Sequence, residues 1–148
     1  MTEPARISPV TIERRRATAA IEDVLHAATY AGISYTITVI DAGGHIIAVV
    51  REDGAALASI DTSQSKARTA LFFAQPTIDL QAAVQPGGPL YTIETSTPWP
   101  LAFVAGGVPI TDVRGTVIGA VGAGGGSPQQ DHDIASEVAG ILQKSVAR

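Results

Sequence analysis

The chain has no cysteine at any of its 148 positions. Disulfides, thiolate nucleophiles, iron–sulfur clusters and cysteine-based zinc sites are therefore excluded. No apolar run approaches the roughly 18 residues that a transmembrane helix needs. Residues 1–8 also lack the apolar core of a secretory signal peptide. From these absences we expect a cytoplasmic protein that spans no membrane.

Charged residues are scarce as well, at 16% of the chain, whereas apolar residues make up 45%. An average soluble domain carries about 25% charged residues. With so few charges, a monomer of this size would expose much apolar surface. Because such surface favours association between subunits, we predict a homo-oligomer. The net charge is −4, and the one basic run, residues 14–16, is followed by acids. This balance argues against nucleic acid as a partner.

Two strand pairs are indicated by alternating, β-branched segments around glycine-containing turns. The first pair comprises residues 35–41 and 45–51, and the second comprises residues 107–112 and 116–122. Residues 85–100 carry several prolines and glycines, so we expect a long irregular loop there, a common place for function.

Helical spacing predicts a first helix that begins at Ser8 and Pro9 and ends at Gly32. Its expected inner face is Ile12, Ala19, Ala20, Val24, Leu25 and Ala28. A second helix should start at Ser59 and end before Pro76, with a shorter one over residues 77–84.

A last helix should open with a capping box at Ser127 and Gln130. The resulting order, α-β-β-α-α-β-β-α, is typical of an α+β domain with an antiparallel sheet flanked by helices. The whole chain, residues 1–148, is expected to form this one domain.

A glycine-rich segment, residues 122–127, connects the last strand to the last helix. Its backbone N–H groups could hold an anion at the helix start, or its glycines could simply permit a tight connection. The segment lacks the third glycine of a dinucleotide fingerprint and the Gly-Lys-Ser/Thr ending of a phosphate loop. Both interpretations of it stay open.

None of the three histidines forms a metal pair at helical spacing, and no metal site is expected. His26 follows Glu22 and Asp23 on one predicted helix, so it could act as a haem axial ligand or lie at a helix border as an ordinary surface residue. Asp131 falls in the first turn of the last helix, where an acid complements the helix dipole.

Lys66 lies on a predicted helix beside apolar residues. It could be a base of lowered pKa, an anion anchor or a surface lysine. Arg51 ends a strand, where it could hold a carboxylate or pair with a nearby acid. No Gly-x-Ser-x-Gly elbow is present, so a hydrolase triad has no support.

Six segments together resemble the GlcG/HbpS-like family of haem-degrading domains, which includes the C-terminal part of PduO-type proteins. The segments run in order from about residue 33 to residue 141 and comprise residues 41–45, 51–54, 59–69, 85–91, 106–110 and 119–122. The resemblance implies a profilin-like sheet flanked by helices, and a homo-oligomer. The chain departs from the family pattern around residues 98–101.

The resemblance also implies haem as a possible cofactor, because some relatives bind it. In that hypothesis His26 is the axial ligand and the propionates contact Arg51, Lys66 and Arg68. Tyr91 belongs to one of the matching segments, and Trp99 could form a wall for a flat aromatic ligand.

A second hypothesis is a cofactor-free lyase or isomerase that acts on a small carboxylate or hydroxylated aromatic. Arg51 would bind the carboxylate, and Lys66 or Asp53 would move a proton. Backbone N–H groups near Gly106 and Gly107 would stabilise the developing negative charge. A third hypothesis is an assembly partner of a neighbouring enzyme.

Overall fold

A computed structural model describes residues 12–146, with the side chains of residues 144–146 left out. Within that range the four strands form one antiparallel sheet in the order β2-β1-β4-β3. The fold predicted from the sequence, an antiparallel sheet flanked by helices, is confirmed. The main elements are α1 (Arg14–Leu25), β1 (Thr36–Asp41), β2 (Ile46–Arg51), α2 (Ala58–Phe73), β3 (Gly107–Thr111), β4 (Val117–Gly124) and α3 (Pro128–Val146).

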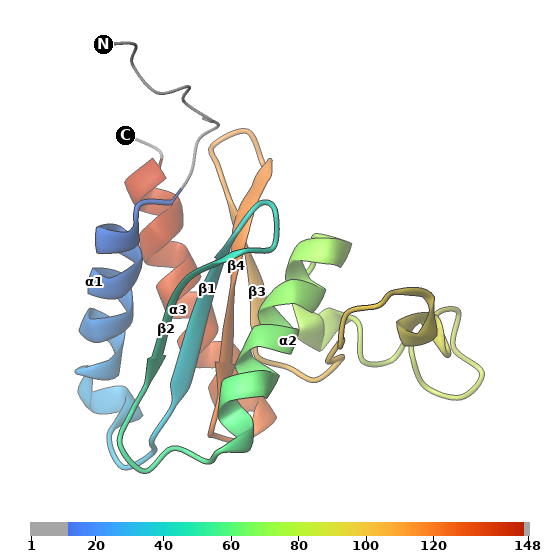
Figure 1. Ribbon diagram of the computed structural model, residues 1–148, viewed down its shortest axis with the longest axis horizontal. Coiled ribbons are helices and arrows are strands. Elements are labelled where there is room, and N and C mark those ends of the chain that lie inside the picture. The colour runs from blue at the N-terminus through green and yellow to red at the C-terminus, as the bar shows by residue number, and fades with distance from the viewer. Residues whose placement is uncertain (1–11, 147–148) are drawn as a thin grey trace, which may run out of the picture.

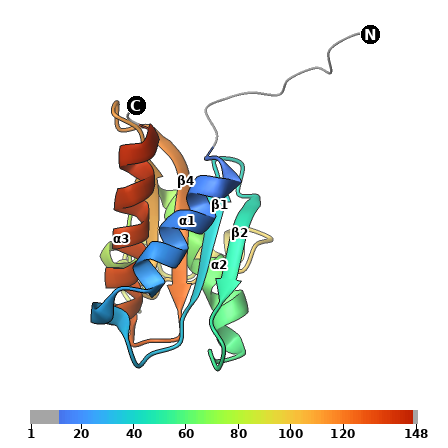
Figure 2. The same cartoon turned by 90° about the vertical axis from the view of Figure 1, so that its left-hand side faces the viewer.

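Helices cover both faces of this sheet (Figure 1). Helices α1 and α3 lie on one face, as Figure 2 shows from that side, and α2 lies on the other. Strand β1 separates two packing environments, because alternate side chains of a strand point to opposite faces. Its Ile37 and Val39 belong to the main core beneath α1 and α3, whereas Thr36 and Thr38 contact α2.

The face beneath α2 is built from small and polar residues. Thr36 and Thr38 pair through their hydroxyls with Ser59 and Ser63 of α2, at 2.7 Å and 2.8 Å between oxygens. Strand β4 presents Gly122 to the same helix, and a Cβ there would lie 1.9 Å from the carbonyl oxygen of Ser63. Helix and strand therefore approach backbone to backbone, which only glycine permits.

The first helix is shorter than the sequence indicated. Ser8 and Pro9 lie outside the described residues, but Ile12 and Glu13 are not helical and α1 ends at Leu25 rather than at Gly32. The chain becomes extended at Ala27 and then forms a 3₁₀ turn, Ala28–Tyr30.

This break in the chain brings Tyr30 inward. Its hydroxyl donates a hydrogen bond to Glu137 of α3 at 2.7 Å, and its ring meets Tyr35 edge to face at 6.1 Å between centroids. Ala20 and Val24 are buried as predicted, whereas Ala19 and Ala28 are exposed, contrary to the predicted inner face.

The short helix predicted over residues 77–84 is absent; only a 3₁₀ turn, Thr77–Asp79, and further turns occur there. The hydroxyl of Thr77 donates to the carbonyl of Val104 at 2.7 Å and accepts the N–H of Gly107 at 2.9 Å. These tertiary bonds fix the segment against the start of β3 in place of a helix. The long loop that follows includes a second 3₁₀ turn, Ile93–Ser96, and extends away from the rest of the molecule (Figure 1).

The capping box at the start of α3 is confirmed. The N–H of Gln130 donates to the Ser127 hydroxyl at 3.2 Å, and the Gln130 side chain accepts the N–H of Ser127 at 2.8 Å. Between residues 12 and 146, no helix has the length and apolar character required to cross a membrane. The cytoplasmic location stays a prediction.

Candidate functional site

Two clefts contain four of the residues that the sequence analysis singled out, namely His26, Arg51, Asp53 and Lys66. The first, which we call the His26 cleft, is an open depression of about 370 Å³ between the end of α1 and the end of β2. It brings His26 close to Arg51 and Asp53, which lie on a different segment of the chain. Its lining is Glu22, Leu25, His26, Val50, Arg51, Glu52 and Asp53.

His26 caps the C-terminal end of α1, and its ring contacts the backbone of the preceding turn. Its ring Nδ1 lies 2.7 Å from the carbonyl oxygen of Glu22 and 3.8 Å from the Glu22 carboxylate, while 80% of the side chain is exposed. A neutral imidazole that donates from Nδ1 to a carbonyl keeps a lone pair on Nε2. This is the arrangement in which histidine commonly coordinates a metal, with its other nitrogen fixed by a backbone oxygen.

The rest of the His26 cleft is mainly polar and charged, with a small apolar part. Leu25 and Val50 are half-buried and Arg51 is exposed. The Glu52 carboxylate accepts the N–H of Tyr35 at 2.9 Å, so this acid also fixes the end of the hairpin. Arg51 supplies a permanent positive charge to this cleft. The lining also contains three carboxylates, those of Glu22, Glu52 and Asp53.

The second cleft, which we call the Lys66 cleft, has a volume of about 380 Å³ and lies between the start of α2 and the start of α3. None of its lining residues belongs to the His26 cleft. Its lining is Ala56, Ala58, Ser59, Thr62, Lys66, Ala102, Val104, Gly124, Gly125, Gly126, Pro128 and Asp131.

A buried ion pair forms the floor of the Lys66 cleft. The Lys66 ammonium lies 2.8 Å from the Asp131 carboxylate and donates to the carbonyl of Ala123 at 3.1 Å. Their side chains are only 8% and 3% exposed. Burial raises the pKa of Asp131 above its ordinary value, although the bonds from Lys66 and from the Gly126 N–H oppose that shift.

Glycines make room for this pair. Gly106 has φ +130, and a Cβ there would lie 2.9 Å from both Lys66 Cδ and Asp131 Cβ. The N–H of Gly107 is already donated to Thr77. The hypothesis in which Gly107 stabilises a developing negative charge is therefore wrong for that donor. In the glycine-rich segment before α3, the N–H of Gly126 binds Asp131, the protein's own carboxylate, at 2.9 Å.

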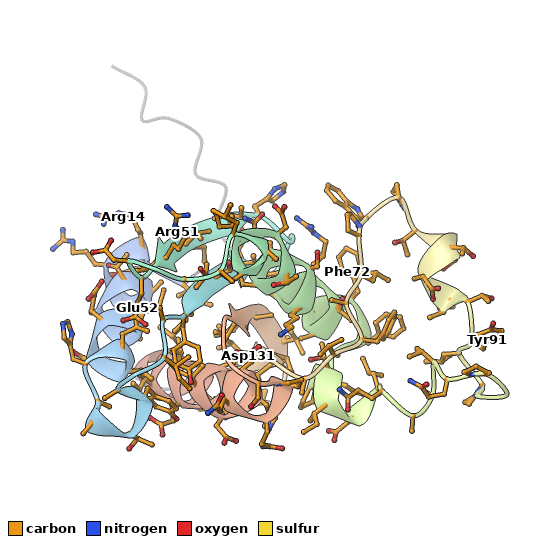
Figure 3. The ribbon with its side chains drawn as sticks, turned by 90° about the horizontal axis from the view of Figure 1, so that it is seen from below. Arg14, Arg51, Glu52, Phe72, Tyr91 and Asp131 are labelled. Atoms are coloured by element: carbon orange, nitrogen blue, oxygen red, sulfur yellow. The ribbon has the colours of Figure 1, made fainter. Side chains whose placement is uncertain are left out.

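The remaining candidates lie away from both clefts. The Arg68 guanidinium stacks on the Trp99 ring, 4.5 Å from its centroid, so each of these side chains is a partner of the other. Tyr91 is 55% exposed on the long loop. Figure 3 shows Tyr91 at the far end of that loop, Asp131 between α2 and α3, and Arg51 with Glu52 near α1.

Asp131 is the functional candidate that sequence reasoning missed, since its position explained it fully as an acid complementing the helix dipole. The structure instead buries Asp131 against Lys66. The sequence did contain a signal for Lys66. Helical spacing places it on one face of the helix with Ser59, Ser63 and Ala70. These small residues mark the face of α2 that packs on the sheet, and Lys66 shares that face.

The model of the family described as "Haem degrading protein HbpS-like" matches residues 12–140 of this chain. The chain belongs to this family. HbpS from Streptomyces reticuli, solved as a double mutant, has a TM-score of 0.80 and 27% identity to this chain, covering 96% of it and 97% of the HbpS chain. A crystal structure of a PduOC–heme complex has a TM-score of 0.77 and 27% identity, covering 91% and 95% of the two chains.

Two curated relatives of this HbpS-like chain come from Citrobacter freundii. An uncharacterized 15.0 kDa protein from the dhaT-dhaS intergenic region is 37% identical over 103 residues, or 70% of this chain and 72% of that protein. The corrinoid adenosyltransferase PduO is 34% identical over 103 residues, which are 30% of its length. The present chain thus corresponds to less than a third of PduO.

Proposed function

We propose that this HbpS-like protein binds haem at the His26 cleft, with His26 as the axial ligand. The observation that carries the proposal is the geometry of His26, whose Nδ1 is fixed by the Glu22 carbonyl at 2.7 Å while the ring stays exposed in a cleft. Family membership supports the choice of ligand, because one structural relative is a complex of PduOC with heme.

The residues of the His26 cleft fit the three requirements of a haem site, which are an apolar surface, an axial ligand and a cation for a propionate. Leu25 and Val50 supply the apolar surface, and His26 supplies the ligand. Arg51 would be the cation that contacts a propionate. Bound haem supplies an iron centre; the protein contributes the ligand and its orientation.

The cleft is open, so it contacts only part of a macrocycle. A second copy of the chain that packs against it would cover the rest, and the low charge of the chain, 16% of its residues, favours such association. We therefore propose a homo-oligomer as the haem-binding form.

The lyase or isomerase hypothesis has less support. It needs Arg51, a base and the Gly106 and Gly107 N–H groups in one site. Arg51 and Asp53 line the His26 cleft, but Lys66 lines the other cleft, and Gly106 and Gly107 line neither. Lys66 is also bound to Asp131 in a buried ion pair at 2.8 Å.

Haem binding can be tested by titrating the purified protein with haemin and recording the Soret band. We expect a saturable, shifted band with a fixed number of haems per chain. His26→Ala should abolish the shift or weaken binding at least about tenfold, since the axial bond is lost. His45→Ala is the matched control, because this exposed histidine lies in the turn at the other end of β2.

A titration of the wild type that never saturates would refute haem binding. Saturable binding that His26→Ala leaves unchanged would instead refute the assignment of the axial ligand. An equal loss in His45→Ala would point to nonspecific coordination by surface histidines.

A further inference from the structure

Among the described residues, the Lys66 ammonium has two hydrogen-bond partners. An ammonium group carries three N–H donors. Two of them bind the Asp131 carboxylate at 2.8 Å and the Ala123 carbonyl at 3.1 Å. Lys66 lines the cleft, so its third donor is available to an oxygen atom placed there.

A second polar group at the cleft also lacks a partner. Thr62 lies one helical turn before Lys66 and lines the same cleft. Within residues 12–146 its hydroxyl makes no hydrogen bond, whereas the neighbouring Ser59 and Ser63 hydroxyls are bonded to strand β1. Thr62 and Lys66 thus present a hydroxyl and an N–H donor on adjacent turns, toward one space.

The other walls of the cleft are apolar. Ala102 and Val104 come from the segment before β3, Ala56 and Ala58 from the start of α2, and Pro128 from the start of α3. The volume of about 380 Å³ lies at the lower end of the range for small-molecule sites. An apolar surface around a few convergent polar groups is typical of such sites.

Charge balance selects the class of ligand. Lys66 and Asp131 cancel each other when both are ionised. A ligand carboxylate would place a second negative charge beside the buried carboxylate of Asp131, and like charges close together disfavour ionisation. A neutral oxygen acceptor gains the hydrogen bonds without that repulsion.

We propose that the Lys66 cleft is a second binding site, for a small uncharged molecule with an apolar body and a carbonyl or hydroxyl oxygen. That oxygen accepts the third N–H of Lys66 and exchanges a hydrogen bond with Thr62. The site shares no residue with the His26 cleft, so it stands independently of haem binding.

The test is a titration of the full-length, ¹⁵N-labelled protein with cyclohexanone, followed by ¹H–¹⁵N NMR. We expect saturable shifts at Gly124, Gly125 and Gly126, whose backbone lines the cleft. Cyclohexanecarboxylate, a probe of similar size with a negative charge, should bind more weakly at neutral pH.

Two variants locate the site. Thr62→Val removes the free hydroxyl at an exposed position and should weaken ketone binding about 3- to 10-fold, the effect of one hydrogen bond. Ala58→Trp fills the cleft from an exposed position and should abolish the shifts. Thr29→Val is the matched control, because Thr29 is exposed and belongs to the lining of neither cleft.

Absence of saturable shifts with either probe would overturn the site itself. Tighter binding of the carboxylate would overturn the proposed ligand class. Equal effects of Thr62→Val and Thr29→Val would overturn the role of Thr62. His26→Ala should leave ketone binding unchanged, which keeps this result separate from the haem titration.

Discussion

At the scale of single residues, Lys66 and Asp131 form the most consequential polar contact among the described residues. Each is almost fully buried, and each is the other's counter-ion at 2.8 Å. A buried pair adds little net stability over apolar residues, but the loss of one member leaves an unpaired charge in a poorly solvated place. The pair also links α2 to the start of α3.

Lys66→Met should therefore lower the free energy of unfolding by about 3–5 kcal/mol near neutral pH, because Asp131 would lose its counter-ion. Urea denaturation followed by circular dichroism measures this change. Glu13→Gln, which removes an exposed ion pair with Arg16, should change stability by less than about 1 kcal/mol.

The substitution Lys66→Met should also change how the stability of the protein depends on pH. Burial already raises the pKa of Asp131 in the folded state, and Lys66→Met removes two of the contributions that lower it. The folded variant then binds a proton more tightly than the unfolded chain, so its stability falls as pH rises through the raised pKa. The deficit relative to wild type should be smaller at about pH 4 than at about pH 7. A deficit that grows on acidification would contradict this account.

Residue-level prediction from the sequence was limited to local patterns. The spacing of Glu22 and His26 left two interpretations of the histidine open, and the structure shows an exposed ring close to the backbone carbonyl and the carboxylate of Glu22. The partner of Lys66 could not be predicted, because Asp131 lies 65 residues away and its position at a helix start had a sufficient local explanation.

At the scale of elements, the contacts of α2 with strands β3 and β4 depend on glycines. A Cβ at Gly122 would lie 1.9 Å from the Ser63 carbonyl oxygen, and one at Gly107 would lie 2.2 Å from the Lys66 carbonyl oxygen. Both contacts are with helix backbone, which cannot shift without moving α2. The position of α2, and with it the Lys66 cleft, thus depends on residues that have no side chain.

Gly122→Ala should destabilise the protein by about 3 kcal/mol or more, the upper end of the cost of overpacking. Gly140→Ala is the matched control within α3, where a Cβ would meet no atom within 4 Å. That substitution should stabilise the protein by about 0.5–1 kcal/mol, because alanine favours the helix interior. Thermal unfolding of both variants measures the contrast, and a mild effect at Gly122 would mean that α2 can move away from β4.

Elements with strong local signals were predicted well. Both strand pairs, the end of α2 before Pro76 and the capping box of α3 agree with the structure. The pairing of β1 with β4 was beyond sequence reasoning, because it joins strands about 80 residues apart and no local pattern encodes it. The helix predicted over residues 77–84 failed for a related reason, since Thr77 bonds to Val104 and Gly107 across the fold.

At the scale of the whole molecule, the surface that α2 leaves uncovered favours self-association. Ile46 and Val49 lie on the edge strand β2, 50% and 38% exposed, and Phe72 of α2 is 43% exposed. Val49 pairs with Thr38, whose hydroxyl contacts α2, so Val49 points to the α2 side of the sheet. Gly44, just before Ile46, lies close to Phe72. The side chains of Ile46, Val49 and Phe72 form an apolar strip beside the edge strand β2. Edge strands readily pair with other chains.

We therefore expect the wild-type protein to be a homo-oligomer at micromolar concentrations, with a mass in light scattering that is an integral multiple of the chain mass. The double variant Val49→Lys and Phe72→Lys should shift the population to smaller species, because two charges would have to be buried in the contact. Val113→Lys, at a residue 74% exposed in the turn between β3 and β4, is the control and should leave the mass unchanged. If the wild type is monomeric, the proposal of a haem site completed by a second copy loses its basis. If the double variant keeps the mass of the wild-type oligomer, the contact between copies lies elsewhere on the surface.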